Sequence, residues 1–368
     1  MSRKLSIFFV CLYGSLVLIF SVLLFALPKK DFSPTENRTL SGFPRFSPQS
    51  ILDGSYMEKF SSFCADGFPF RSFFLTLDSS RELALGKLEA DGVMLGRDGN
   101  LIKRLEYNDA SLLKSNLNRI EELRLFVEGK GADSVFFCAP RGVDVLADFC
   151  PFPFDGTRCA DAWKELGEAV TATEELREKA ASGEYVFYKT DHHWTTLGAY
   201  YAYAALGKAL GYSPLPLTEF TVEIVSDSFL GTTYSAALIP STTPDSIIAM
   251  RYENDEDIKV TDISTGKVGG LYDYSALNGS SKYDFFLGGN KARLRVESGK
   301  KPKLIIIKDS FANSLIPFLA RHFDMEVIDP RYLRQPLEKV LEELYGEGDP
   351  PTLLFFFGLD SLNGKIGL

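Results

Sequence analysis

The sequence predicts an α/β fold in which helices flank a mostly parallel sheet. Short and nearly continuous apolar runs recur along the chain, as expected of strands that are buried on both faces. Longer segments with helical spacing lie between these runs, and such alternation is typical of a parallel sheet. The chain has 368 residues, of which 45% are hydrophobic, so it is long enough to bury a large core.

The first element is the uncharged apolar run from Ile7 to Leu27. About 20 apolar residues suffice to cross the hydrocarbon core of a bilayer. No cleavage site of the A-x-A kind follows the run, so we predict an uncleaved anchor over residues 1–30. The rest of the chain contains no second run of this length, which predicts a single-pass membrane protein with its main domain outside the cytoplasm.

Composition excludes some classes of partner. The formal net charge is −9, and the basic residues are scattered among acidic ones, so we expect no nucleic-acid partner. Of the five cysteines, Cys150 and Cys159 could form a disulfide across a loop rich in Pro and Gly. The cysteines show no spacing typical of a metal site.

Residues 31–105 contain four Asp-Gly pairs, which are turn signals, and we predict an irregular segment that wraps around the next domain. Residues 106–368 are predicted to form the α/β domain. Within it, residues from about 214 to 299 are rich in turn residues and β-branched residues and predict a β-rich insertion.

The expected elements of the α/β domain follow from hydrophobic spacing. Strands are predicted at Asp133–Ala139, Glu184–Lys189, Lys303–Lys308, Met325–Asp329 and Thr352–Phe357. Helices are predicted at Asn108–Lys130, Cys159–Ala181, Thr195–Leu210, Phe311–Phe323 and Gln335–Tyr345. Pro317 should kink the fourth of these helices or delay its start.

Histidine is scarce, because the chain contains only His192, His193 and His322. Asp191 stands two positions before His193, so its carboxylate can accept a hydrogen bond from one ring nitrogen and leave the other free to act as a base. The motif follows a predicted strand, at the end of the sheet where open α/β folds bind their ligands.

A matching nucleophile is found at a second strand-to-helix turn. Ser310 follows the apolar run of Lys303–Lys308 and precedes a segment with helical spacing. Backbone N–H groups at the start of such a helix favour a developing oxyanion. Together, the two turns predict a triad of Ser310, His193 and Asp191.

Other interpretations of these residues stay open at this point. Asp309 and Ser310 are residue types that commonly cap a helix, and Asp191 could likewise cap the helix that begins after Trp194. The histidines could pack in the core. Asp191, His192 and His193 could instead bind a metal ion, although adjacent histidines rarely converge on one ion and no remote ligand is evident. We therefore predict neither a metal nor a cofactor.

Residues 189–195, Lys-Thr-Asp-His-His-Trp-Thr, resemble the signature of the DHHW protein family. With residues 308–311, Lys-Asp-Ser-Phe, they are similar to the alginate O-acetyltransferase group of SGNH-hydrolase-like proteins. The resemblance begins at Glu-Asn-Arg, residues 36–38, and continues through Asp-Gly-Phe-Pro-Phe-Arg, residues 66–71. In that group the Asp-x-His element precedes the serine, as it does here.

The resemblance implies that Ser310 is the nucleophile, His193 the base and Asp191 the residue that orients it. His192, Trp194 and Asp309 are then supporting or substrate-facing residues. Candidates for the oxyanion hole are Gly231 and Asn313.

The resemblance also implies transfer of an acetyl group to an exported or cell-envelope polysaccharide through an acetyl-serine. A membrane-bound O-acyltransferase is the implied partner that supplies acetyl groups. An acetylesterase with the same triad and a catalytically silent envelope-assembly or glycan-binding protein are the alternatives.

Overall fold

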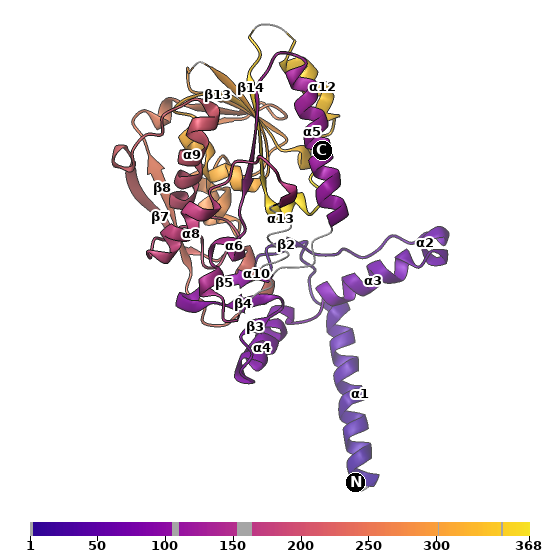
Figure 1. The fold of residues 1–368 in the computed structure, drawn as a ribbon. Helices are drawn as coiled ribbons and strands as arrows, with labels where there is room; N and C mark the ends of the chain where they lie inside the picture. The colour runs from indigo at the N-terminus through magenta and orange to yellow at the C-terminus, as the bar shows by residue number, and fades with distance from the viewer. Residues whose placement is uncertain (1–2, 105–109, 153–163, 301, 347–348) are drawn as a thin grey trace. The chain divides into compact units, whose positions relative to one another are not determined.

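The computed structural model describes the chain except for residues 1–2, 105–109, 153–163, 301 and 347–348 (Figure 1). It consists of two compact units. The N-terminal unit comprises Met1–Asp91 with Ser235–Ser241, and the sheet unit comprises Gly92–Tyr234 with Thr242–Leu368. Cys159 lies outside the described residues, and so does the predicted disulfide.

The N-terminal unit begins with α1, Arg3–Ala26, which has no buried residue. It is the one helix in the described part of the chain that is long and apolar enough to cross a membrane. The segment predicted to be irregular contains three further helices. The remaining elements of this unit are α2 (Pro48–Leu52), α3 (Ser55–Asp66), α4 (Arg71–Ala84), β1 (Phe32–Ser33), β2 (Arg38–Thr39) and β3 (Glu89–Ala90).

The two N-terminal motifs noted in the sequence meet in this unit. Arg38 pairs with Asp66 at 2.5 Å and with Glu36 at 2.8 Å. Glu36 also accepts a hydrogen bond of 3.0 Å from Nε of Arg71. The guanidinium of Arg38 lowers the pKa of Asp66 below its usual range. The motifs are thus a structural clamp on the segment that follows α1.

The sheet unit contains a seven-stranded sheet with the order β10-β9-β11-β13-β12-β14-β6 (Figure 1). Its strands are β6 (Ser134–Ala139), β9 (Lys259–Asp262), β10 (Val268–Gly269), β11 (Arg293–Glu297), β12 (Lys303–Lys308), β13 (Asp324–Ile328) and β14 (Thr352–Gly358). The neighbours from β13 to β6 pair in parallel, whereas β13, β11, β9 and β10 pair antiparallel. The sheet is therefore mixed, and the prediction of a mostly parallel sheet holds for one half only.

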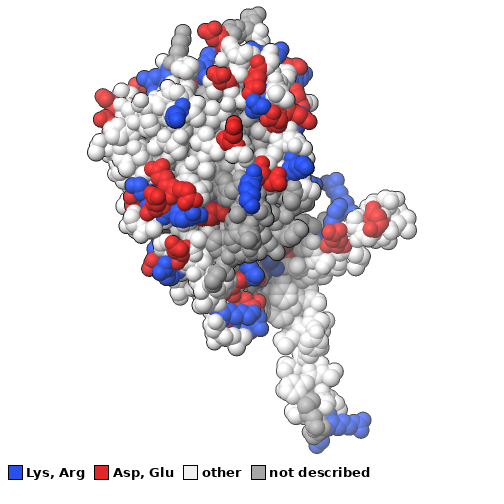
Figure 2. All heavy atoms as spheres, viewed as in Figure 1, with Lys and Arg blue, Asp and Glu red and all other residues white. Residues whose placement is uncertain are grey.

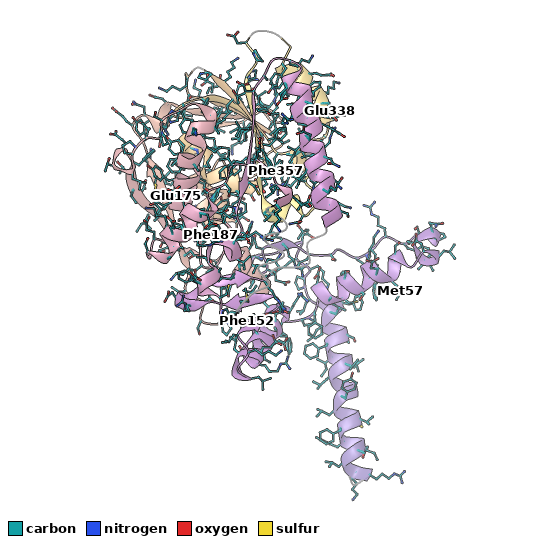
Figure 3. The ribbon with its side chains drawn as sticks, in the orientation of Figure 1. Met57, Phe152, Glu175, Phe187, Glu338 and Phe357 are labelled. Carbon is teal, nitrogen blue, oxygen red and sulfur yellow. The ribbon has the colours of Figure 1, made fainter. Side chains whose placement is uncertain are left out.

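Helices cover both faces of the parallel half. Ile305 and Ile307 of β12 pack in a core with α5 (Ala110–Glu128) and α12 (Leu337–Leu344). Leu304 and Ile306 face the opposite core, which includes α8 (Thr173–Ala181) and α9 (Thr196–Leu210). Figure 3 shows Glu338 on α12 and Glu175 on α8 on opposite sides of the sheet. Burial on both faces explains why β12 reads as a continuous apolar run.

The helix predicted at Thr195–Leu210 is confirmed as α9. The side chain of Thr195 caps it by accepting from the N–H of Gly198, and Gly211 ends it in the left-handed conformation at φ 73°. Asp191 is not its cap, so that interpretation of Asp191 is wrong.

The strand predicted at Glu184–Lys189 is wrong. Its one isolated bridge among the described residues joins Phe187 to Trp194. The N–H of Tyr188 donates to the carbonyl of His193, so the segment folds back on the Asp-His loop and does not enter the sheet. An apolar run of this length can be buried in either way, and its sequence does not distinguish them.

Two predicted helices are interrupted in the structure. In the described part of the helix predicted at Cys159–Ala181, α8 spans Thr173–Ala181 and Val170 instead bridges to Phe137, while residues 159–163 lie outside the described residues. After Ser310, a 3-10 turn η7 (Ser310–Ser314) precedes the single turn of α11 (Ile316–Leu319). Pro317 stands in the first turn of α11, so the predicted delay is observed.

The region predicted as an insertion is largely part of the fold. Strands β7 (Thr221–Phe229) and β8 (Asp245–Arg251) form a separate antiparallel pair, but β9, β10 and β11 extend the central sheet. The region also contains the short helix α10 (Thr232–Ala237). The remaining elements of the sheet unit are β4 (Val93–Leu95), β5 (Leu101–Lys103), α6 (Gly142–Val145) and α13 (Leu359–Leu362).

Candidate active site

Asp191, His193 and Ser310 form one hydrogen-bonded chain. Nδ1 of His193 lies 2.5 Å from Oδ1 of Asp191, and its Nε2 lies 2.8 Å from Oγ of Ser310. Asp191 and His193 are buried, with 4% and 5% exposure, while Ser310 is partly exposed. With Nδ1 donating to the carboxylate, Nε2 is left to accept the serine proton, which is the geometry that activates a hydroxyl.

Asp191 is held by donors on both of its oxygens. Its Oδ1 also accepts from the N–H of His193 at 3.0 Å, and its Oδ2 accepts from the N–H and the hydroxyl of Thr232 at 2.7 and 2.9 Å. Burial alone would raise the pKa of Asp191, but the neighbouring imidazoles and these donors hold it well below its usual range. The carboxylate therefore stays charged and fixed in orientation.

The imidazole of His193 is held between two aromatic rings. The ring of Tyr283 stacks on it, with the centroids 4.0 Å apart and the planes 9° apart. Phe311 contacts it at 4.9 Å. The hydroxyl of Tyr283 also bonds the carbonyl of Ser310 at 3.3 Å and Oγ of Ser314 at 3.1 Å. Tyr283 therefore contacts both the ring and the turn that carries the serine.

His192 faces a different environment from His193. Its Nδ1 lies 2.5 Å from the hydroxyl of Thr232, which already donates to Asp191. The hydroxyl proton is thus engaged, so Nδ1 carries a proton and Nε2 is left as an acceptor. Partial burial and the neighbouring His193 lower the pKa of His192, and its side chain is 35% exposed.

The turn that carries Ser310 is built by Asp309 and Trp194. Asp309 is fully buried and accepts from the N–H of Phe311 at 2.9 Å and of Gly358 at 2.7 Å. It is the cap of η7, and Ser310 is the first residue of that turn. Nε1 of Trp194 donates to the carbonyl of Phe311 at 3.2 Å, which ties the histidine loop to the serine turn.

A buried polar network includes Lys308, which precedes this turn, and Asn313, which is part of it. Nζ of Lys308 donates to Oδ1 of Asn313 at 2.6 Å and of Asn290 at 2.9 Å, and it lies 3.6 Å from Oδ2 of Asp329. Burial lowers the pKa of Lys308 to about 8. Nδ2 of Asn313 in turn donates to Asn290 at 3.1 Å. Asn313 thus takes part in this network, and its role as an oxyanion donor stays a prediction.

Gly231 approaches Asp191 closely. Its N–H donates to the hydroxyl of Thr190 at 3.0 Å, and a Cβ at this position would lie 2.2 Å from that of Asp191. Glycine is therefore required for the close contact between the loops. Because its N–H is already engaged, the structure gives its proposed oxyanion role no direct support. The N–H of Ser310, at the first position of η7, is a further candidate.

Ligand atoms of Asp191, His192 and His193 lie within 4.8 Å of one another and could hold a metal ion. However, both ring nitrogens of His193 already contact Asp191 and Ser310. These side chains therefore fit a proton-relay arrangement better than a coordination shell. His322 bonds the hydroxyl of Tyr203 at 2.8 Å and takes no part in this group of residues.

A cavity of about 290 Å³ adjoins this group of residues. Asp191 and His192 line it together with charged side chains of both signs, namely Lys103, Arg104, Arg141 and Asp360. Ser310 and His193 are not among its lining residues. Asp191 and His192 thus connect the cavity to the hydrogen-bonded chain that ends at Ser310.

Sequence reasoning missed three residues that shape the site, namely Thr232, Tyr283 and Asp245. Asp245 accepts hydrogen bonds of 3.0 and 2.8 Å from the N–H groups of Lys189 and Thr190, and so fixes the turn before Asp191. Thr232 follows Gly231, which was singled out as a candidate, so the right loop was identified. For Tyr283 and Asp245 the sequence carried no comparable signal.

Comparison with family models confirms the resemblance seen in the sequence. Residues 169–328 match the model described as DHHW protein. Residues 93–239 match the model described as SGNH hydrolase-like domain, acetyltransferase AlgX. The two matches overlap in the loops that carry Asp191, His193 and Gly231.

A curated relative is the probable alginate O-acetylase AlgJ of Pseudomonas fluorescens, which is 24% identical over 204 residues. The match covers 52% of this chain and 50% of the relative, so the chain spans about half the length of the curated relative it matches.

Solved structures share the fold. A DHHW family protein from Eubacterium siraeum is 21% identical, with a TM-score of 0.58 over 75% of this chain and 94% of that one. PatB1 of Bacillus cereus is 17% identical, with a TM-score of 0.61 over 75% of this chain and 98% of that one. The chain therefore has an SGNH-like α/β fold with a mixed sheet.

Proposed function

We propose that this chain, which matches the DHHW family over residues 169–328, is a membrane-anchored O-acetyltransferase that acts on a polysaccharide outside the cytoplasm. Ser310 is the nucleophile, His193 the general base and Asp191 the residue that orients the imidazole. The hydrogen-bonded chain from Asp191 through His193 to Ser310 is the observation that carries the proposal.

In the first step, Oγ of Ser310 attacks the carbonyl carbon of an acetyl ester while Nε2 of His193 takes the hydroxyl proton. The tetrahedral intermediate collapses as the bond to the leaving oxygen breaks, and His193 returns the proton to that oxygen. The products are acetyl-Ser310 and an alcohol. The N–H of Ser310 is suited to stabilise the oxyanion because it lies at the start of η7.

In the second step, a sugar hydroxyl attacks the acetyl-serine. His193 takes the proton of that hydroxyl and passes it to Oγ of Ser310 as the ester bond to the serine breaks. The acetylated sugar leaves and the free serine is restored. Water in place of the sugar would give an acetylesterase with the same triad.

The polysaccharide acceptor is proposed from the likeness to the alginate O-acetylase. A chain anchored through α1 would meet an exported glycan at the membrane surface. Its acetyl groups would come from a membrane-bound O-acyltransferase in the same membrane. His192 meets the cavity with a free Nε2, so it is suited to accept a hydrogen bond from a substrate hydroxyl.

The test uses the full chain in detergent or nanodiscs with 4-nitrophenyl acetate as the acetyl donor. We expect a burst of 4-nitrophenol and an acetyl group on the peptide that contains Ser310, identified by mass spectrometry. Ser310→Ala should lose both, by about 10³-fold or more in rate. Ser264→Ala, at an exposed position, is the matched control and should behave as wild type.

The acceptor is then added as an acidic or neutral oligosaccharide. Acetylated glycan together with faster turnover supports the transferase, whereas free acetate alone favours the acetylesterase. A wild-type chain that never forms acetyl-Ser310 and behaves as Ser310→Ala does would contradict the enzyme and favour a silent envelope-assembly or glycan-binding protein.

A further inference from the structure

Helix α4 exposes a row of large apolar side chains. Phe70, Phe73, Phe74 and Leu77 are 66%, 62%, 39% and 51% exposed, and they recur at the spacing of one helical face. Single exposed apolar residues are normal on a soluble protein, but a contiguous group of this size marks an interaction site. We call these four side chains the α4 face.

Charged pairs border the α4 face, and the side of α4 opposite it is buried within its own unit at Ser79. Arg71 pairs with Glu36 at 3.0 Å, and Arg81 pairs with Asp78 at 2.7 Å. The buried hydroxyl of Ser79 bonds the carbonyl of Ala237. A short helix that exposes aromatic side chains bordered by charged ones is suited to lie at the boundary between lipid headgroups and acyl chains.

The α4 face lies beside α1. The ring of Phe68 stacks on Phe20 of α1 with the centroids 5.1 Å apart, and Phe74 meets the same ring at 5.9 Å. Figure 2 shows α1 without charged side chains between its basic amino end and the junction with the rest of the chain. Side chains in its last turns stay exposed, with Val22 at 58% and Phe25 at 61%.

The depth of these contacts follows from helix geometry. The apolar run of α1 ends at Leu27, seven residues after Phe20, and a helix rises about 1.5 Å per residue. Phe20 would therefore lie roughly 10 Å below the membrane boundary if the run is fully embedded. Phe68 and Phe74 touch Phe20, so they reach a similar depth, and the α4 face continues from them.

We propose that the α4 face inserts into the lipid leaflet at the carboxyl end of α1 and forms a second membrane contact. The occupant of the face is lipid acyl chain, because the face is continuous with the part of α1 that must itself be in lipid. This inference rests on the anchor included in the proposed function. A second contact beside α1 would hold the N-terminal unit against the membrane, as opposed to leaving it on a flexible tether.

The experiment uses the full chain in nanodiscs of phosphatidylcholine and phosphatidylglycerol with a lipid-soluble aryl diazirine. After photolysis, labelled residues are mapped by peptide mass spectrometry. We expect label on α1 and on residues 68–77. Val222 and Ile224 of β7, which are 60% and 66% exposed in the sheet unit, are the control for binding of the reagent to any exposed apolar side chain and should stay unlabelled.

A second measurement uses quenching by lipids brominated on their acyl chains. The added fluorescence of Phe73→Trp should be quenched at least several-fold more than that of Val222→Trp, with the wild-type signal subtracted. Label on α1 without label on residues 68–77, or equal quenching of the two variants, overturns the inference and leaves the anchor intact.

Two further outcomes are distinguishable. Absence of label on both α1 and residues 68–77 overturns the anchor as well, and with it the membrane part of the proposed function. Protection of residues 68–77 that appears only in particles holding two copies of the chain would show that a second copy covers the face, which also overturns the inference. Formation of acetyl-Ser310 is independent of each of these results.

Discussion

Nε2 of His193 lies 2.8 Å from Oγ of Ser310, although 117 positions separate the two residues in the chain. The imidazole reaches the serine because the loop that contains it is held on three sides. Trp194 bonds the serine turn, Tyr283 stacks on the ring, and Asp191 fixes its far nitrogen. The contacts of Asp191 and Tyr283 can be removed singly and can therefore be tested.

Asp191→Asn should lower the rate of acetyl-Ser310 formation by about 10³- to 10⁴-fold while the chain remains folded, because an amide cannot hold the imidazole in the required tautomer. Burst kinetics with 4-nitrophenyl acetate measure the rate, and circular dichroism checks folding. Asp227→Asn, at an exposed position of β7, is the control. A rate within about threefold of wild type would argue against the role assigned to Asp191.

Thr232→Val should slow acylation by roughly 5- to 10-fold, since it removes one hydrogen bond to Asp191 worth about 1 kcal/mol but keeps the bond from the backbone N–H. Thr232→Ser retains the hydroxyl and should stay close to wild type. Both are measured in the same burst assay. If Thr232→Ser is as slow as Thr232→Val, loss of the hydroxyl does not explain the slower acylation.

Tyr283→Phe should cost roughly 3- to 10-fold in the acylation rate, because it loses the bonds to Ser310 and Ser314 but keeps the stack on His193. Tyr283→Leu loses the stack as well and should be slower still. Burial raises the pKa of Tyr283, so its hydroxyl stays neutral and the difference should not vary between pH 6 and 9. Equal rates for both variants and wild type would show that Tyr283 does not position the imidazole.

We expect the burial of Lys308 to make the free energy of unfolding depend on pH in the alkaline range. Its pKa is lowered to about 8 from the ordinary 10.5, so between these values the unfolded chain binds more protons than the folded chain. Stability therefore rises with pH across this window. Relative to Lys308→Met, the free energy of unfolding of wild type should increase by on the order of 3 kcal/mol between pH 7 and 11.

The measurement is urea unfolding of both chains at a series of pH values. Taking the difference between them cancels the titration of groups that both share, and the lost hydrogen bonds to Asn290 and Asn313 add only a constant offset. A difference that does not change with pH would mean that the ammonium is not destabilised by burial.

Hydrophobic spacing predicted correctly the strands and helices that are buried along most of their length. Strand β12 coincides with the apolar run of Lys303–Lys308, and α9 agrees to within one residue with the helix predicted at Thr195–Leu210. The run at Glu184–Lys189 is also short and apolar at its centre, but it packs against its own loop. The spacing of apolar residues indicates that a segment is buried, but it does not indicate which part of the protein covers that segment.

The candidate site was predictable to the extent that its residue types are rare and adjacent in the chain. Three histidines and one Asp-x-His spacing suffice to select Asp191 and His193, and Ser310 stands at a strand end that the sequence marks clearly. Asp245 and Tyr283 are common residue types in a region without a motif. Their contribution arises only because the chain returns to the loop after 50 or more intervening residues.

The sequence by itself determined an N-terminal apolar helix, an α/β domain and the choice of Asp191, His193 and Ser310 as candidate site residues, because each of these depends on the type and spacing of neighbouring residues. Only the tertiary structure decided that the sheet is mixed, that Gly231 admits Asp191 and that Thr232 and Tyr283 support the imidazole. These features depend on which distant segments share a surface. That choice is set by the free energy of packing the whole chain, which no local pattern contains.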